Sequence, residues 1–119
     1  MYKRQLSGVS AGAICWFDKG ITDSWKDSQA TLDCLGFVEG ICCPHYDEEP
    51  ERIPYVKNIL INNKIKECYA IEGYTALHII NNVPKYNVSF KKDTSCYRVF
   101  KTNDLITHSD INDIIRIEL

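Results

Sequence analysis

Several features that would place this chain in a special class of protein are absent from its sequence. No apolar run approaches the roughly 18 residues that span a bilayer. No secretory signal is visible, because Ser7, Gly8 and Ser10 interrupt the segment that follows the basic start. The formal net charge is only -2, with both signs scattered over 119 residues, so no nucleic acid or anionic membrane is indicated as a partner. We expect one domain of ordinary globular composition.

The sequence also lacks the cysteine spacings that are typical of metal and redox sites. Its six cysteines include no C-x-x-C pair, and Cys42 and Cys43 are adjacent, an awkward geometry for a mutual disulfide. In a chain with no visible signal peptide we expect reduced thiols, most of them small buried residues. No cluster of metal ligands is visible either. These observations favour a cytoplasmic protein that uses no metal or cofactor.

Apolar strand-like runs mingle with helical spacing, which indicates the α/β class. Apolar residues at helical spacing follow the acidic start of 47–63 and predict a helix there. A second short helix is expected at 11–17. We expect strands at 6–9, 32–38, 40–43, 68–71, 75–80 and 96–100, an irregular loop at 18–31, a break at 81–84 and a polar stretch after 100.

The stretch Gly8-Val9-Ser10-Ala11-Gly12 has the Gly-x-Ser-x-Gly pattern of a nucleophile elbow. Such a turn from strand to helix is so tight that its flanking residues must be small, and it exposes the serine hydroxyl above the sheet. The Ala11 amide would then be placed to donate to an oxyanion. A tight strand–helix turn without chemistry is the alternative interpretation of the same pattern.

A serine nucleophile needs a base, and the chain has three histidines. His78 falls within an apolar strand, and His108 lies in the polar C-terminal stretch, so we expect structural or surface roles for both. His45 follows a proline at the end of an apolar run, and functional residues favour strand ends in α/β sheets. His45 is therefore the expected base, with a structural cap as the alternative.

The acid that would orient the histidine is less well determined by position. Asp23 lies in the loop after the elbow helix, and this loop can fold back beside the serine. On position alone Asp23 leads Asp27 only slightly. The aspartates weighed for this role are Asp18, Asp23, Asp27, Asp33 and Asp47.

Three stretches together resemble the peptidase E and cyanophycinase family of serine peptidases: Gly8-Val9-Ser10-Ala11-Gly12-Ala13, Thr22-Asp23-Ser24 and Cys43-Pro44-His45-Tyr46. In that family a G-x-S-A-G-A elbow carries the nucleophile, a T-N-D or T-D-S stretch an aspartate, and a P-H-[FY] stretch the histidine. The order is the same here, and a weaker similarity continues through Ala70-Ile71-Glu72-Gly73. The resemblance implies Ser10 as nucleophile, Asp23 as orienting acid and His45 as base.

The resemblance also implies the fold of the class I glutamine amidotransferases, a largely parallel sheet flanked by helices. Family members have an N-terminal half, absent here, that supplies the first strands and a second oxyanion donor. We therefore expect residues 6–119 to be the C-terminal part of a single α/β peptidase domain, and residues 1–5 resemble a translated sequencing adapter. Because one lost oxyanion donor costs on the order of 3 kcal/mol, we expect the chain alone to be a poor enzyme.

For the intact protein the resemblance implies hydrolysis of a small peptide through an acyl-enzyme, without a cofactor. Family members accept acidic aspartyl substrates, so Arg52 is a candidate for binding the substrate, with a solvated helix residue as the alternative. Two other functions stay open. One is an inactive fragment or non-enzymatic binding domain, and the other is a serine esterase or acyl transferase that uses the same residues.

Overall fold

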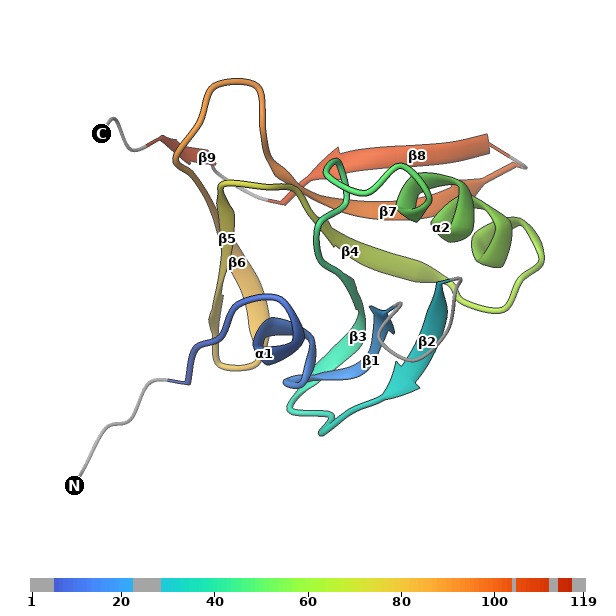
Figure 1. Cartoon of the computed structure of the whole chain (residues 1–119), viewed down its shortest axis with the longest axis horizontal. Coiled ribbons are helices and arrows are strands. Elements are labelled where there is room, and N and C mark those ends of the chain that lie inside the picture. Colours follow the sequence, from blue (N-terminus) through green and yellow to red (C-terminus); the bar gives the residue numbers. More distant parts are fainter. Residues whose placement is uncertain (1–5, 23–28, 104, 112–113, 117–119) are drawn as a thin grey trace.

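The computed structural model of the chain describes residues 6–22, 29–103, 105–111 and 114–116 (Figure 1). Asp23, Asp27 and the adapter-like residues 1–5 therefore lie outside the described residues. The elements within the described part are α1 (Ala11–Ile14), β1 (Phe17–Thr22), β2 (Ala30–Asp33), β3 (Val38–Cys43), α2 (Arg52–Ile61), β4 (Glu67–Ile71), β5 (Thr75–Ile80), β6 (Val83–Ser89), β7 (Cys96–Thr102), β8 (Leu105–Asp110) and β9 (Ile114–Arg116).

The described strands form two sheets. The larger has six strands in the order β2-β1-β3-β4-β7-β8, in which β3 runs parallel to both of its neighbours, β1 and β4, and the other pairs are antiparallel. The smaller has three strands in the order β5-β6-β9. The expected α/β class is confirmed, but the larger sheet is mixed rather than largely parallel. Short links such as that from Thr102 to Leu105 explain this, because a parallel pair needs a crossover of a dozen or more residues.

Two apolar clusters lie on opposite faces of the larger sheet. Successive side chains of a strand point to opposite faces, and accordingly Ile41 and Cys43 of β3 belong to one cluster while Cys42 belongs to the other. The first cluster contains the buried face of α2, and the second contains Ile14 of α1, with Leu77 and Ile79 of β5 packed against it. Figure 1 shows α2 beside β7 and β8, whereas α1 packs against β1 and β3.

The segment 6–9 differs from its prediction as the end of a buried strand. It has no strand partner among the described residues, and the exposed fractions of Leu6 and Val9 are 61% and 86%. A strand conformation needs a neighbour for its backbone hydrogen bonds, and no described strand pairs with this segment. The chain therefore enters the elbow as exposed irregular backbone.

The predictions for 11–17 and 18–31 are wrong in their boundaries. The helix ends at Ile14, and β1 occupies the first part of the expected loop. Pairing with β2 on one side and β3 on the other gives this polar segment its strand conformation, so tertiary contacts override its composition. Gly20 allows β1 to pass close to α1, because a Cβ there would lie 2.7 Å from the side chain of Ile14.

Three further predictions are corrected by turns and pairing. The expected strand 32–38 is interrupted at Gly36, which has a φ of 76° and separates β2 from β3. The expected break at 81–84 is a hairpin turn, with φ values of 53° and 64° at Asn81 and Asn82 as in a type I′ turn. The polar stretch after 100 contains β8, which pairs along the whole edge of β7.

The described cysteines are free thiols, and Cys42, Cys43, Cys68 and Cys96 are buried. Burial raises the pKa of Cys43 to about 12 and that of Cys96 to about 11, so both thiols are protonated and packed as small apolar groups. The prediction that most cysteines are buried packing residues is confirmed. Within the described ranges, no helix has the length and apolar character needed to cross a membrane.

Candidate active site

Ser10 stands at the first turn of α1 in a strained backbone conformation. Its φ of 56° and ψ of -118° lie in a region that non-glycine residues rarely adopt, at a cost of about 1–3 kcal/mol. The tight turn requires glycine at Gly8, because a Cβ there would collide with the backbone carbonyl of Gly12. The Ser10 side chain makes no capping bond to the helix, so its hydroxyl is available for another partner.

That partner is His45, although 35 residues separate the two in sequence. The Ser10 Oγ lies 2.9 Å from the Nε2 of His45. His45 follows β3 and also has a left-handed backbone, with a φ of 55°, between the buried residues Pro44 and Tyr46. The structure thus brings together the serine and the histidine that the sequence singled out, at a distance suitable for proton transfer.

The other ring nitrogen of His45 faces Glu48, a residue that was not among the predicted site residues. The His45 Nδ1 lies 3.0 Å from the Glu48 Oε1, and the Glu48 side chain is 48% exposed. The backbone turn itself sets this spacing, since the Glu48 N–H donates to the His45 carbonyl. An acid three residues after the histidine is the signal that could have found it. Asp23, the predicted acid, lies outside the described residues.

The other described aspartates that were weighed have different partners. Asp18 accepts the N–H of Gly40, Asp33 pairs with Lys19, and Asp47 accepts the N–H of Gly73. None of these contacts involves His45. The remaining alternative, Asp27, lies outside the described part of the chain.

His78 and His108 lie apart from Ser10 and agree with the structural or surface roles expected of them. His78 is an exposed residue of β5 whose ring lies beside that of Tyr86. The Nε2 of His108 on β8 lies 2.7 Å from the hydroxyl of Tyr46. Partial burial is the main cause that lowers the pKa of His108, and the charge of Lys57 adds to it.

Arg52, the expected substrate contact or solvated residue, is buried with 3% of its surface exposed. Its Nε donates to Glu49 at 2.9 Å, and its Nη1 donates to the Ile21 carbonyl at 2.6 Å. The hydrogen bond from Arg52 is the main cause that lowers the pKa of Glu49. The expectation of a solvated residue is thus wrong, because the guanidinium ties the start of α2 to the end of β1.

Two hollows adjoin the pair Ser10–His45. A small cavity of about 80 Å³ is lined by Ala11, Arg52 and the two residues themselves, among others. A groove of about 1080 Å³ extends from them along the whole of β5, and no lysine or arginine lines it among the described residues. Within the described part there is also no group of acidic, histidine and cysteine side chains that could hold a metal ion.

Comparison with known proteins identifies a family and a relative. The family model for peptidase family S51 matches residues 3–85, a range that contains Ser10, His45 and Glu48. A protein of Bacillus subtilis (strain 168) named uncharacterized peptidase YgaJ is 42% identical over 94 residues, which are 79% of this chain and 40% of that protein. The chain therefore spans about 40% of the length of the curated relative it matches.

Proposed function

The chain belongs to peptidase family S51, and we propose that Ser10 and His45 are the nucleophile and base of a serine-type peptidase site. The observation that carries the proposal is the 2.9 Å contact between the Ser10 Oγ and the His45 Nε2. The strained φ of 56° at Ser10 supports it, because such strain concentrates at functional sites.

The proposed reaction follows from these contacts. The His45 Nε2 accepts the proton of the Ser10 hydroxyl while the oxygen attacks the carbonyl carbon of a peptide bond. The same nitrogen then gives the proton to the leaving amine, and the acyl group stays on Ser10 as an ester. Water, deprotonated by His45, hydrolyses this ester and releases the acid. Glu48 accepts a hydrogen bond from the His45 Nδ1–H and so keeps Nε2 free to take a proton.

The Ala11 N–H is the proposed donor to the oxyanion, since the first N–H groups of a helix have no acceptor within the helix. We further propose that residues 6–119 are one part of a larger α/β domain of the amidotransferase-like fold, whose other part supplies a second donor. The large exposed fractions of Leu6 and Val9 support this. So does the open space beside Gly12, where a Cβ would meet nothing within 4 Å.

For the substrate, we propose a small peptide, with an aspartyl residue as the first choice to test. Arg52 lines the small cavity beside Ser10 and His45 and is the candidate to bind a substrate carboxylate. Its guanidinium, however, already binds Glu49 and the Ile21 carbonyl. An acidic substrate would therefore need a cation from outside the described residues, and an uncharged peptide is the matched second choice. A simple ester tests the esterase and acyl transferase alternatives, because acyl transfer to Ser10 is common to all of them.

The test is covalent labelling of Ser10 by a fluorophosphonate together with hydrolysis assays on aspartyl and uncharged dipeptides. We expect the label on Ser10, and the variant Ser10→Ala to lose both labelling and hydrolysis by at least about 10³-fold. Ser109→Ala on β8 is the matched serine control and should retain both. A folded chain that neither reacts at Ser10 nor cleaves peptide or ester would overturn the proposal in favour of a non-enzymatic domain.

A further inference from the structure

Gly73, in the turn between β4 and β5, lies against the carboxylate that contacts His45. A Cβ on Gly73 would lie 2.7 Å from the Cδ and 2.9 Å from the Oε1 of Glu48. This Oε1 is the atom that lies 3.0 Å from the His45 Nδ1. The carboxylate of Glu48 thus occupies the space that any side chain at Gly73 would need.

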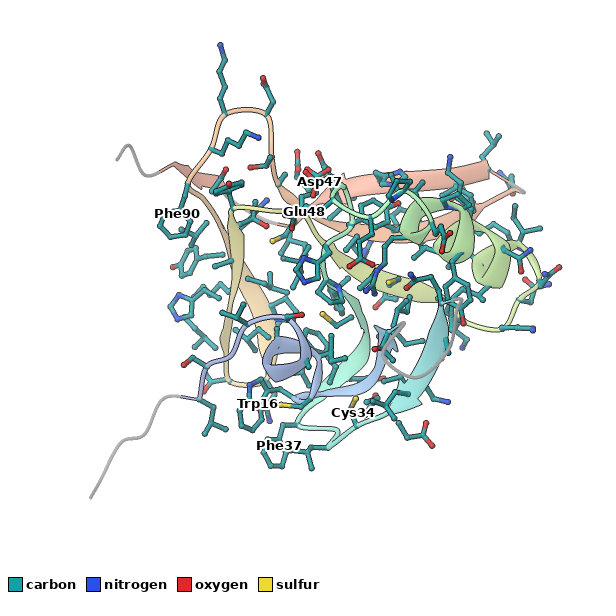
Figure 2. All side chains as sticks on the ribbon, in the orientation of Figure 1. Trp16, Cys34, Phe37, Asp47, Glu48 and Phe90 are labelled. Atoms are coloured by element: carbon teal, nitrogen blue, oxygen red, sulfur yellow. The ribbon has the colours of Figure 1, made fainter. Side chains whose placement is uncertain are left out.

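The two turns are also joined by hydrogen bonds. The Gly73 N–H donates to the Asp47 Oδ1 at 2.7 Å, and the Tyr46 N–H donates to the Ile71 carbonyl at 3.0 Å. Figure 2 shows the side chains of Asp47 and Glu48 next to each other in this region. These bonds hold the end of β4 against the segment that carries His45 and fix the distance from Gly73 to Glu48.

We propose that Gly73 is a positioning residue, whose missing side chain lets Glu48 reach the His45 Nδ1 and set the tautomer of the imidazole. The proposal deepens the proposed function and rests on it for the roles of Ser10 and His45. Gly73 touches no reacting atom and acts through Glu48. The β4–β5 turn, 28 residues after the histidine, thereby helps to position the carboxylate that contacts His45.

Gly73→Ala separates positioning from folding. The φ of Gly73 lies outside the left-handed range, so alanine fits the backbone. The atoms that its methyl group would meet are the far end of a flexible side chain that is 48% exposed. Glu48 can therefore swing into water at little loss of stability, but its oxygen then leaves Nδ1, and a displacement of about 1 Å can lower the rate by up to about 10²-fold.

The experiment uses the full chain with ¹⁵N-labelled histidine and reads the tautomer of His45 by NMR, with His45→Gln to assign its signals. We expect the Nδ1–H form in the wild type, a mixture of tautomers in Gly73→Ala, and about a 10- to 100-fold lower kcat. In a Glu48→Ala background, Gly73→Ala should change neither quantity further, because the group it displaces is already gone. A purely structural role for Gly73 would instead give additive losses.

An unchanged tautomer in folded Gly73→Ala would overturn the proposal, as would additive losses in the double variant. If Gly73→Ala does not fold, Asp47→Ala takes its place, with Asp47→Asn keeping an oxygen for the Gly73 N–H. A tautomer shift of His45 in Asp47→Ala but not in Asp47→Asn supports the proposal. Equal histidine spectra of these two variants overturn it. The tautomer is measured without substrate, so failure of the proposed peptidase activity in the Ser10 assays remains a separate result.

Discussion

The two turns that meet at the candidate site share a strained backbone but are held in different ways. The φ values of Ser10 and His45 are 56° and 55°. The turn of Ser10 is fixed locally, by the close approach of Gly8 to Gly12, and its residue Val9 is 86% exposed. The turn of His45 is instead fixed by distant parts of the chain, through buried neighbours and hydrogen bonds to the end of β4.

This difference shows two ways of maintaining a conformation that costs about 1–3 kcal/mol. A local turn of small residues needs little support from the core, so changes in it should lower activity without unfolding the protein. A turn anchored in the core should show coupled losses of activity and stability when its anchors are removed. Substitutions in and around each turn test this difference.

The largest expected effect comes from Glu48→Gln in the turn of His45. An amide there can stabilise the wrong tautomer of His45, and we expect kcat to fall by about 10³- to 10⁴-fold. Glu72→Gln is the matched control on the same groove, because the Glu72 carboxylate accepts the Ser95 N–H at 2.9 Å and an amide oxygen can do the same. The measurement is dipeptide hydrolysis by Glu48→Gln, Glu72→Gln and Asp23→Asn. A larger loss in Glu72→Gln or Asp23→Asn than in Glu48→Gln would show that Glu48 is not the acid that orients His45.

In the turn of Ser10, Gly8→Ala should lower kcat by about 10²-fold. The added methyl group forces the carbonyl of Gly12 to move, and the displaced turn misaligns the Ser10 hydroxyl. The methyl group meets backbone that must shift, so some stability is lost, but the turn is exposed and has few packed neighbours, and we expect the free energy of unfolding to fall by less than about 2 kcal/mol. Activity assays and urea unfolding on one preparation test this. A large loss of stability would show that the core supports this turn as well.

The same contrast explains what could be predicted from the sequence. Gly8, Ser10 and Gly12 form one local pattern, and the tight turn into a helix that it predicts is present, with Ser10 at a φ of 56°. The contact between Glu48 and Gly73 depends on how β4 packs beside the turn of His45, and no local pattern encodes it. The pairing of β6 with β5 and of β8 with β7 likewise follows from tertiary neighbours rather than from alternation of apolar residues. Asp23 stays a prediction, since it lies outside the described residues.

A third change tests how firmly the turn of His45 is anchored. Arg52→Met should lower the free energy of unfolding by about 2 kcal/mol, because charged hydrogen bonds to Glu49 and the Ile21 carbonyl are lost. The pKa of Glu49 is lowered in the folded protein, so its contribution is present above the ordinary value of 4.5 and is lost as the pH falls through the lowered value. Urea unfolding from pH 7 to 3 should show a larger acid-dependent loss in the wild type than in Arg52→Met, because Arg52 is the main cause of the lowered pKa of Glu49. Equal stability of the two proteins at pH 7 would contradict the anchoring role.

The smallest expected effect concerns the bond from Tyr46 to His108, which ties the same turn to β8. The pKa of His108 is lowered from 6.5 by partial burial and by Lys57, so the folded state favours the neutral ring, which can accept the Tyr46 hydroxyl proton at Nε2. Stability from this group is therefore present above pH 6.5 and is lost as the pH falls through the lowered value. The ring of Tyr97 also lies edge-on to the His108 ring. We expect a loss of less than about 0.5 kcal/mol between pH 7.5 and 5, because solvent still reaches and screens this partly exposed site. Urea unfolding of the wild type and His108→Phe isolates this part, and an identical pH dependence in both would show that the bond does not anchor the turn.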